Sequence, residues 1–66
     1  MQIIKDKNGK VICKADPLWG LIEAKYQKMT VRTTLAIGES ISIEREDSVT
    51  RIIRVNRSFF CVKHIA

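Results

Sequence analysis

A chain of 66 residues can build only one small hydrophobic core, so we expect a single domain over residues 1–66. Chains of this size bury about 60% of the surface that the unfolded chain exposes, and a disulfide, a metal ion or a partner subunit often stabilises them further. The 45% apolar and 29% charged shares are those of a folded protein rather than a disordered one. The small core therefore makes a homodimer one arrangement to expect.

The compartment expected from the sequence is the cytoplasm, with no membrane partner. The opening MQIIKDKNGK has no apolar signal region, and no stretch approaches the roughly 20 apolar residues of a membrane helix. Cys13 and Cys61 are too far apart for a CxxC motif, so we interpret them as buried free thiols. A zinc site built from them and His64 would lack a usual fourth ligand. The sequence thus predicts neither a metal nor a cofactor.

The pair Asn8-Gly9 predicts an N-terminal β-hairpin over residues 2–14, because both residues favour the positive φ angles of a type I′ turn. A two-residue turn places Ile4 opposite Cys13. One face of this hairpin is then apolar: Ile4, Val11, Cys13 and Ala15. The other face is basic, with two isoleucines among the lysines: Ile3, Lys5, Lys7, Lys10, Ile12 and Lys14.

Asp16-Pro17 is typical of a helix start, since Asp caps free N–H groups and Pro suits the first helical position. Apolar residues then recur near helical spacing: Leu18, Leu21, Ile22, Tyr26 and Met29. This pattern predicts a helix that ends near Met29. Gly20, which costs about 1 kcal/mol inside a helix, weakens its first turn.

Residues 30–45 alternate as strands do, and two arrangements are open around Gly38. A three-residue loop over residues 38–40 would pair Leu35 with Ile43 in a hairpin. Alternatively, one long strand would run through the segment with a bulge at Gly38. The charged residues 44–47 predict a solvated turn, and residues 59–65 predict a final strand.

Residues 48–58 fit either a helix or a strand, and the helix is favoured. Asp47 or Ser48 would cap the helix, and three apolar residues would share one face: Val49, Ile52 and Ile53. As a strand the segment mixes apolar and charged residues on one face. The fold class predicted from the sequence is therefore α+β: an N-terminal hairpin, a helix, an antiparallel sheet and a second short helix over 48–58.

The sequence favours binding over catalysis. A single histidine without a paired acid gives no general acid–base site, and the three glycines form no phosphate loop. The net charge is +5, concentrated toward the two ends of the chain. On a helix, Arg51, Arg54 and Arg57 would form a basic stripe about 10 Å long that could meet successive phosphates. The main hypothesis is thus a nucleic-acid-binding regulator, with the hairpin residues Lys5, Lys7 and Lys10 as a second contact.

A protein-interaction module, such as an inhibitor of a host or defence protein, is the alternative hypothesis. Aromatic residues and arginine dominate the energetics of protein interfaces. The predicted anchors of such a module are Trp19, Tyr26 and Phe59.

Three segments of the second half of the chain resemble small proteins encoded by bacteriophages and prophages. They are the strand-like Ile37–Ile43, the basic Arg51–Arg57 and the aromatic and basic Phe59–Lys63. The resemblance spans Leu35 to Ile65 and does not include the N-terminal hairpin. It implies a mobile-element origin and a role in regulation or in host interaction.

Overall fold

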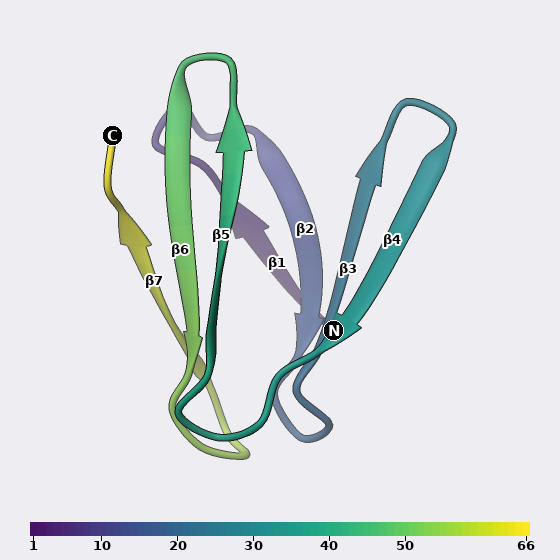
Figure 1. Ribbon diagram of the computed structural model, residues 1–66, viewed down its shortest axis with the longest axis vertical. Coiled ribbons are helices and arrows are strands. Elements are labelled where there is room, and N and C mark those ends of the chain that lie inside the picture. The colour runs from purple at the N-terminus through teal and green to yellow at the C-terminus, as the bar shows by residue number, and fades with distance from the viewer.

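The computed structural model describes residues 1–66 and is all-β, with seven antiparallel strands and no helix (Figure 1). The predicted α+β class is therefore wrong. Sheet A contains four strands: β1 (Gln2–Lys5), β2 (Val11–Asp16), β3 (Leu21–Tyr26) and β4 (Met29–Thr34). Sheet B contains three strands: β5 (Ser40–Arg45), β6 (Ser48–Arg54) and β7 (Phe60–His64).

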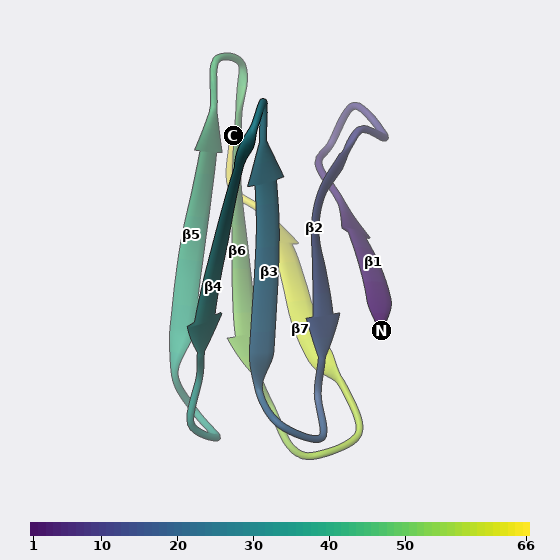
Figure 2. The same cartoon turned by 90° about the vertical axis from the view of Figure 1, so that its right-hand side faces the viewer.

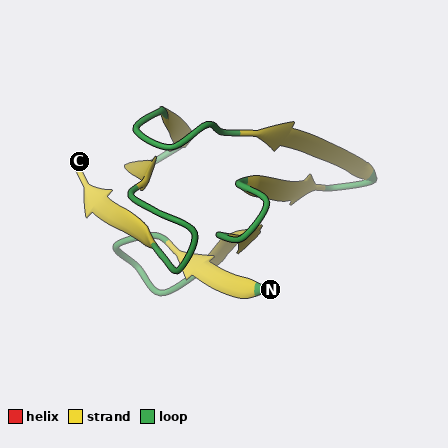
Figure 3. Cartoon of the chain, turned by 90° about the horizontal axis from the view of Figure 1, so that it is seen from below, coloured by secondary structure: helices red, strands yellow, loops and turns green.

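The two sheets face each other around one hydrophobic core. Figure 2 shows sheet A in front of sheet B, and Figure 3 shows the strands arranged around a common interior. Within each sheet, successive strands are neighbours, and only residues 35–39 cross from one sheet to the other. Both sheets and the crossing contribute to the core: Ile4, Ile12, Cys13, Ala15, Ile22, Leu35, Ile43, Ile52 and Phe60. The outer faces of both sheets are thus left to solvent.

The N-terminal hairpin forms, and Ile4 pairs with Cys13 as predicted. The predicted type I′ turn is wrong, because only Gly9 has a positive φ, at 80°. The Asp6 carboxylate instead shapes a longer turn by accepting the N–H groups of Asn8 at 2.8 Å and Lys10 at 3.0 Å. The register then shifts at a bulge, and this buries Ile12 and exposes Val11, which had been predicted the other way round.

The predicted helix over residues 17–29 is wrong; the segment contains a turn, β3 and the start of β4. The Asp16 side chain accepts the Leu18 N–H at 3.1 Å, and Gly20 adopts a φ of 70°, which no helix accommodates. Gln27, with a φ of 56°, makes the tight turn between β3 and β4. The helical spacing was misleading because Ile22, Ala24 and Tyr26 also share one face of a strand.

Both arrangements predicted around Gly38 are wrong, because β4 and β5 belong to different sheets. The Leu35 N–H donates to the Gly20 carbonyl at 2.8 Å and so continues the β3–β4 ladder beyond Thr34. The chain then leaves sheet A, and the Gly38 N–H bonds to the Arg54 carbonyl of sheet B at 2.8 Å. The turn predicted over 44–47 is limited to residues 46 and 47, because Glu44 and Arg45 belong to β5. The final strand predicted over 59–65 is confirmed as β7.

The predicted helix over residues 48–58 is also wrong, because residues 48–54 form β6, the central strand of sheet B. Its inward positions hold three polar side chains and one apolar one: Ser48, Thr50, Ile52 and Arg54, all buried. These polar residues disguise the two-residue period that identifies a half-buried strand. Arg51 and Arg54 therefore lie on opposite faces of a strand instead of on one side of a helix.

Candidate nucleic-acid interface

The predicted arginine stripe does not form. Arg54 is 8% exposed, and its guanidinium donates to three backbone carbonyls: Pro17 at 3.1 Å, Leu18 at 2.9 Å and Leu35 at 2.9 Å. Arg51 is exposed on the outer face of sheet B, and Arg57 is exposed in the loop between β6 and β7. Arg54 is consequently a structural residue that joins the sheets, and the other two arginines lie apart.

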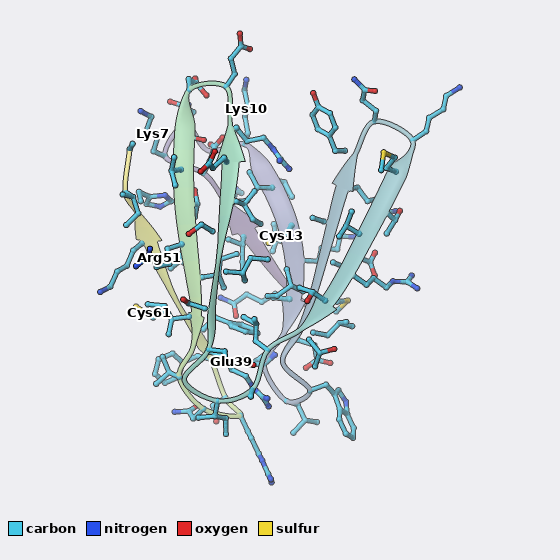
Figure 4. The ribbon with its side chains drawn as sticks, viewed as in Figure 1. Lys7, Lys10, Cys13, Glu39, Arg51 and Cys61 are labelled. Carbon is cyan, nitrogen blue, oxygen red and sulfur yellow. The ribbon has the colours of Figure 1, made fainter.

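The predicted hairpin lysines are also separated. Figure 4 shows Lys7 and Lys10 at the end of the molecule opposite Glu39. There Asn8 Nδ2 donates to Asp47 Oδ2 at 3.0 Å, which joins the β1–β2 turn to the acidic β5–β6 turn. Lys10 borders an open cleft of about 800 Å³ whose charged lining is predominantly acidic: Asp6, Lys10, Glu44, Arg45, Glu46 and Asp47. This end of the molecule is therefore a mixed surface rather than a basic one.

Lys5 belongs to a different surface, the outer face of sheet A. Residues paired across a sheet point to the same face, and Lys14, Glu23 and Arg32 are aligned in register on β2, β3 and β4. Strand alternation places Lys5 and Lys25 on this same face, because Ile4 and Ile22 point to the core. All four basic residues are exposed: Lys5, Lys14, Lys25 and Arg32.

The spacing of these cations follows from the sheet. Strands lie about 4.8 Å apart, so the backbones at Lys14 and Arg32 are about 10 Å apart, with Glu23 between them. Lys25 is two residues beyond Glu23 on β3, about 7 Å along the strand. The four cations thus share one face of the sheet at spacings that several phosphates of one nucleic-acid chain could contact. We call the outer face of sheet A that carries these four residues the basic face.

Both carboxylates on the basic face already have hydrogen-bond donors. Glu23 Oε2 accepts from Arg32 Nε at 3.1 Å, and Asp16 accepts the Leu18 N–H at the end of β2. Because the Glu23 contact uses Nε, the terminal Nη1 and Nη2 groups of Arg32 remain available to an anion. The outer face of sheet B carries only two exposed cations, Arg51 and Lys63, beside Glu44.

A shallow hollow of about 340 Å³ on the basic face brings together donors that suit an anion. It is lined by Lys25, Thr30 and Arg32, together with Glu23. An ammonium, a hydroxyl and a guanidinium are the usual donors to phosphate oxygens in protein–nucleic acid contacts. The hollow is open to solvent, so it suits a phosphate group bound at the surface rather than an enclosed small molecule.

Three residues of the basic face were absent from the predicted site: Lys14, Lys25 and Arg32. The predicted helix over 17–29 removed Lys25 from the sheet that contains Lys14. The signal that could have found them is the alternation of apolar and polar residues along Ile22–Tyr26 and Met29–Arg32, in which Glu23 and Lys25 share one face.

The predicted aromatic anchors are all exposed, but they lie at two ends of the molecule. Trp19 is 70% exposed in the β2–β3 turn, and Phe59 is 48% exposed just before β7. Figures 1 and 2 show these two connections and the 35–39 crossing at the same end. We call it the loop end; it also exposes Leu18, Ile37 and Val55. Tyr26, 60% exposed, lies at the opposite end of β3, where the Arg45 guanidinium is 5.4 Å from its ring centroid.

The two cysteines lie in different sheets as free thiols, Cys13 buried and Cys61 half-buried. Burial raises the pKa of the Cys13 thiol to about 11, so this thiol is protonated at neutral pH and is a poor nucleophile. On β7, Cys61 and His64 point to opposite faces, because their partners Ile53 and Thr50 do so on β6. The structure brings together no three side chains of the types that ligate metals.

The chain forms no helix of the length and apolarity that crossing a bilayer requires. No protein-family model, curated protein or solved structure matches the chain. The resemblance to phage-encoded proteins stays a prediction.

Proposed function

We propose that this protein binds nucleic acid through the basic face of sheet A and has no catalytic activity. The observation that carries the proposal is the set of four exposed cations on one face of sheet A, where both carboxylates already accept hydrogen bonds. A regulatory role in the cytoplasm and an origin in a bacteriophage or other mobile element belong to the same proposal. The site thus moves from the predicted arginines to β1–β4.

Binding of this kind is mainly electrostatic. Each cation that neutralises a phosphate releases condensed counterions, so affinity falls as salt rises. With four contacts, log K falls with log salt with a slope of about −3 to −4, the steeper value applying to a duplex. Three of the cations are lysines, which act as mobile point charges and read no base edges, so we expect weak sequence preference.

The experiment is a fluorescence-anisotropy titration of labelled duplex DNA, single-stranded DNA and single-stranded RNA at several salt concentrations. The double variant Lys14→Glu/Lys25→Glu should lose at least tenfold in affinity and lower the salt slope by about two. The matched control is Arg51→Glu/Lys63→Glu, which changes the net charge equally on the outer face of sheet B. Equal losses from both pairs, or a salt-independent signal, would contradict the proposal.

Protein binding through the loop end is the second candidate function, and a specific observation favours it. The three connections at that end expose five large apolar side chains beside Arg57: Leu18, Trp19, Ile37, Val55 and Phe59. Scattered exposed apolar residues are ordinary, but a group at one end of a small protein is typical of an interaction surface. Such a module would act as an inhibitor or adaptor of a host protein.

The two candidates are separated by the variant Trp19→Ala/Phe59→Ala. If the loop end binds protein, wild type retains one stoichiometric partner from host lysate, the variant releases it, and both bind nucleic acid equally. If the variant instead loses nucleic-acid affinity while Lys14→Glu/Lys25→Glu retains it, the loop end is the nucleic-acid surface and the basic face is not.

A further inference from the structure

Strand β4 is an open edge of sheet A and lacks the features that usually protect such an edge. It pairs only with β3, runs for six residues without a bulge and contains one charged residue, Arg32. Five of its six residues are exposed. By comparison, β1 has four residues and a bulge. Natural proteins shorten, bulge or charge edge strands to prevent pairing with another chain, so a long regular edge indicates a pairing site.

The free edge of β4 presents backbone hydrogen-bonding groups at alternate residues. Tyr26 and Met29 close the two-residue turn, so the ladder bonds to β3 involve Met29, Val31 and Thr33. The bond from the Leu35 N–H to the Gly20 carbonyl continues the same alternation. The N–H and C=O groups of the intervening residues therefore point away from β3: Thr30, Arg32 and Thr34.

Apolar side chains accompany this edge. Met29 and Val31 share the core-facing side of the hairpin with Tyr26, yet they are 66% and 56% exposed. The reason is visible in Figure 1, where the β3–β4 hairpin diverges from β5 and β6. The other six-residue edge, β5, differs because its apolar residues, Ile41 and Ile43, are half-buried and buried.

We propose that a second copy of this chain pairs with the first along β4, antiparallel, with Val31 opposite its symmetry mate. In this register the outward groups of Thr30 and Arg32 meet those of the partner, forming four backbone hydrogen bonds about a two-fold axis. A shift that centres the axis on Arg32 would set two guanidinium groups opposite each other, which is unfavourable. With Val31 on the axis, Arg32 faces a threonine and keeps its contact with Glu23.

The dimer has one eight-stranded sheet in which two copies of sheet A are continuous. Met29, Val31 and Tyr26 of both copies then share one apolar strip on the concave side. One pair of six-residue strands gives a contact smaller than the roughly 800 Å² per partner of a standard interface, so we expect a reversible dimer that forms between micromolar and millimolar concentration. The inference does not require nucleic-acid binding, although the dimer would place two basic faces side by side.

The first experiment is sedimentation equilibrium without nucleic acid, from 1 µM to about 1 mM protein. Wild type should pass from monomer to dimer, and Thr30→Pro should stay monomeric, because proline removes an outward donor yet is tolerated on an edge. Ser42→Pro is the matched control, since the β5–β6 turn closes at Arg45 and Ser48 and the same alternation points the Ser42 N–H away from β6. Circular dichroism verifies that both variants fold, and Val31→Lys replaces Thr30→Pro if that variant does not.

The register is tested by crosslinking in a Cys61→Ser background with oxidised glutathione. Val31→Cys should form a covalent dimer, because Cα atoms of a non-hydrogen-bonded pair are about 4.5 Å apart and a disulfide spans that distance. Thr30→Cys, displaced diagonally from its mate, should crosslink much less. A wild-type monomer at 1 mM, loss of the dimer in Ser42→Pro but not in Thr30→Pro, or preferential crosslinking at residue 30 would overturn the proposal. Each result is independent of the nucleic-acid titration.

Discussion

Two arginines join the facing sheets, one toward each end of the molecule. They differ in how deeply they are buried and in the number and length of their hydrogen bonds. Arg54, at the loop end, is buried and donates three hydrogen bonds of 2.9 to 3.1 Å to carbonyls of the β2–β3 turn and Leu35. Arg45, at the opposite end, is half-buried, reaches the Ile12 carbonyl at 3.4 Å and lies over the Tyr26 ring. The comparison indicates that the arginine at the loop end joins the sheets more firmly than the arginine at the opposite end does.

We call the end of the molecule opposite the loop end the open end, and the weaker contacts of Arg45 account for its shape. Beside Arg45 the sheets diverge around the cleft of about 800 Å³, and the apolar side of the distal β3–β4 hairpin is uncovered. The two regions therefore differ: the hydrogen bonds of Arg54 close the loop end, and the opposite end is open. The firmer contacts between the sheets lie at the loop end. The free edge of β4, which a second copy can occupy, extends into the open end.

The largest expected effect is that of Arg54→Met. Methionine keeps most of the side-chain volume but removes all donors. The buried Leu35 carbonyl and the part-buried carbonyls of Pro17 and Leu18 then lose this partner, at a cost of about 3 kcal/mol or more in unfolding free energy. In a domain this small such a loss is a large share of the total free energy of unfolding. Arg45→Met is the control and should cost less than about 1 kcal/mol. Urea unfolding followed by tryptophan fluorescence measures both; equal losses would mean that the loop end has no special role.

Gly20→Ala should give the next largest effect, because Gly20 adjoins Arg54. A Cβ atom there would collide with the Leu35 carbonyl oxygen and lie 2.7 Å from Arg54 Nη1, at a φ of 70°. We expect a loss of about 2 to 3 kcal/mol. Gly38→Ala has a φ of 92° but nothing within 4 Å, so only the backbone cost of about 1 kcal/mol applies. If the two variants unfold at the same urea concentration, the close packing at Gly20 contributes nothing.

Arg54 also shows where inference from the sequence succeeds and where it cannot. Local signals sufficed for the hairpin at Asn8-Gly9, the Ile4–Cys13 pairing and the final strand. Arg54 looked like one member of a surface stripe, because a charged residue on an inward strand position is rare and its partners, the carbonyls of residues 17, 18 and 35, are far away in sequence. Polar side chains inside β6 removed the period that would have identified it.

The nucleic-acid site predicted from the sequence was incomplete for a related reason. Lys5 was placed correctly on the outer face of the hairpin, but the cations that surround it come from β2, β3 and β4. Their alignment depends on the register between strands, and the register depends on turns whose shape is set by single interactions. The Leu18 N–H bond to Asp16 is one such interaction, and it makes a turn from a pair that also begins helices.

A pH titration sharpens the comparison at the open end, where Asp6 holds the β1–β2 turn. The N–H groups of Lys10 and Asn8 lower the pKa of the Asp6 carboxyl below its ordinary value. Since the folded pKa is the lower one, this stabilisation is complete above pH 4 to 5 and is lost as the pH falls through the folded pKa. The urea midpoint of Asp6→Asn should therefore fall less than that of wild type between pH 5 and 2. Glu46→Gln, which removes an exposed carboxyl without hydrogen bonds, should follow wild type.

The smallest expected effect is the coupling between Arg45 and Tyr26. A guanidinium 5.4 Å from a ring centroid at a solvent-exposed position contributes about 0.5 kcal/mol. A double-mutant cycle with Arg45→Met and Tyr26→Leu should return that value at low salt, and the cycle of Arg45→Met with Phe59→Leu, at the loop end, should return zero. A coupling above about 2 kcal/mol would show that Arg45 joins the sheets as firmly as Arg54 does. The two ends would then be equally cohesive, and the divergence of the β3–β4 hairpin would need a cause other than weak attachment at Arg45.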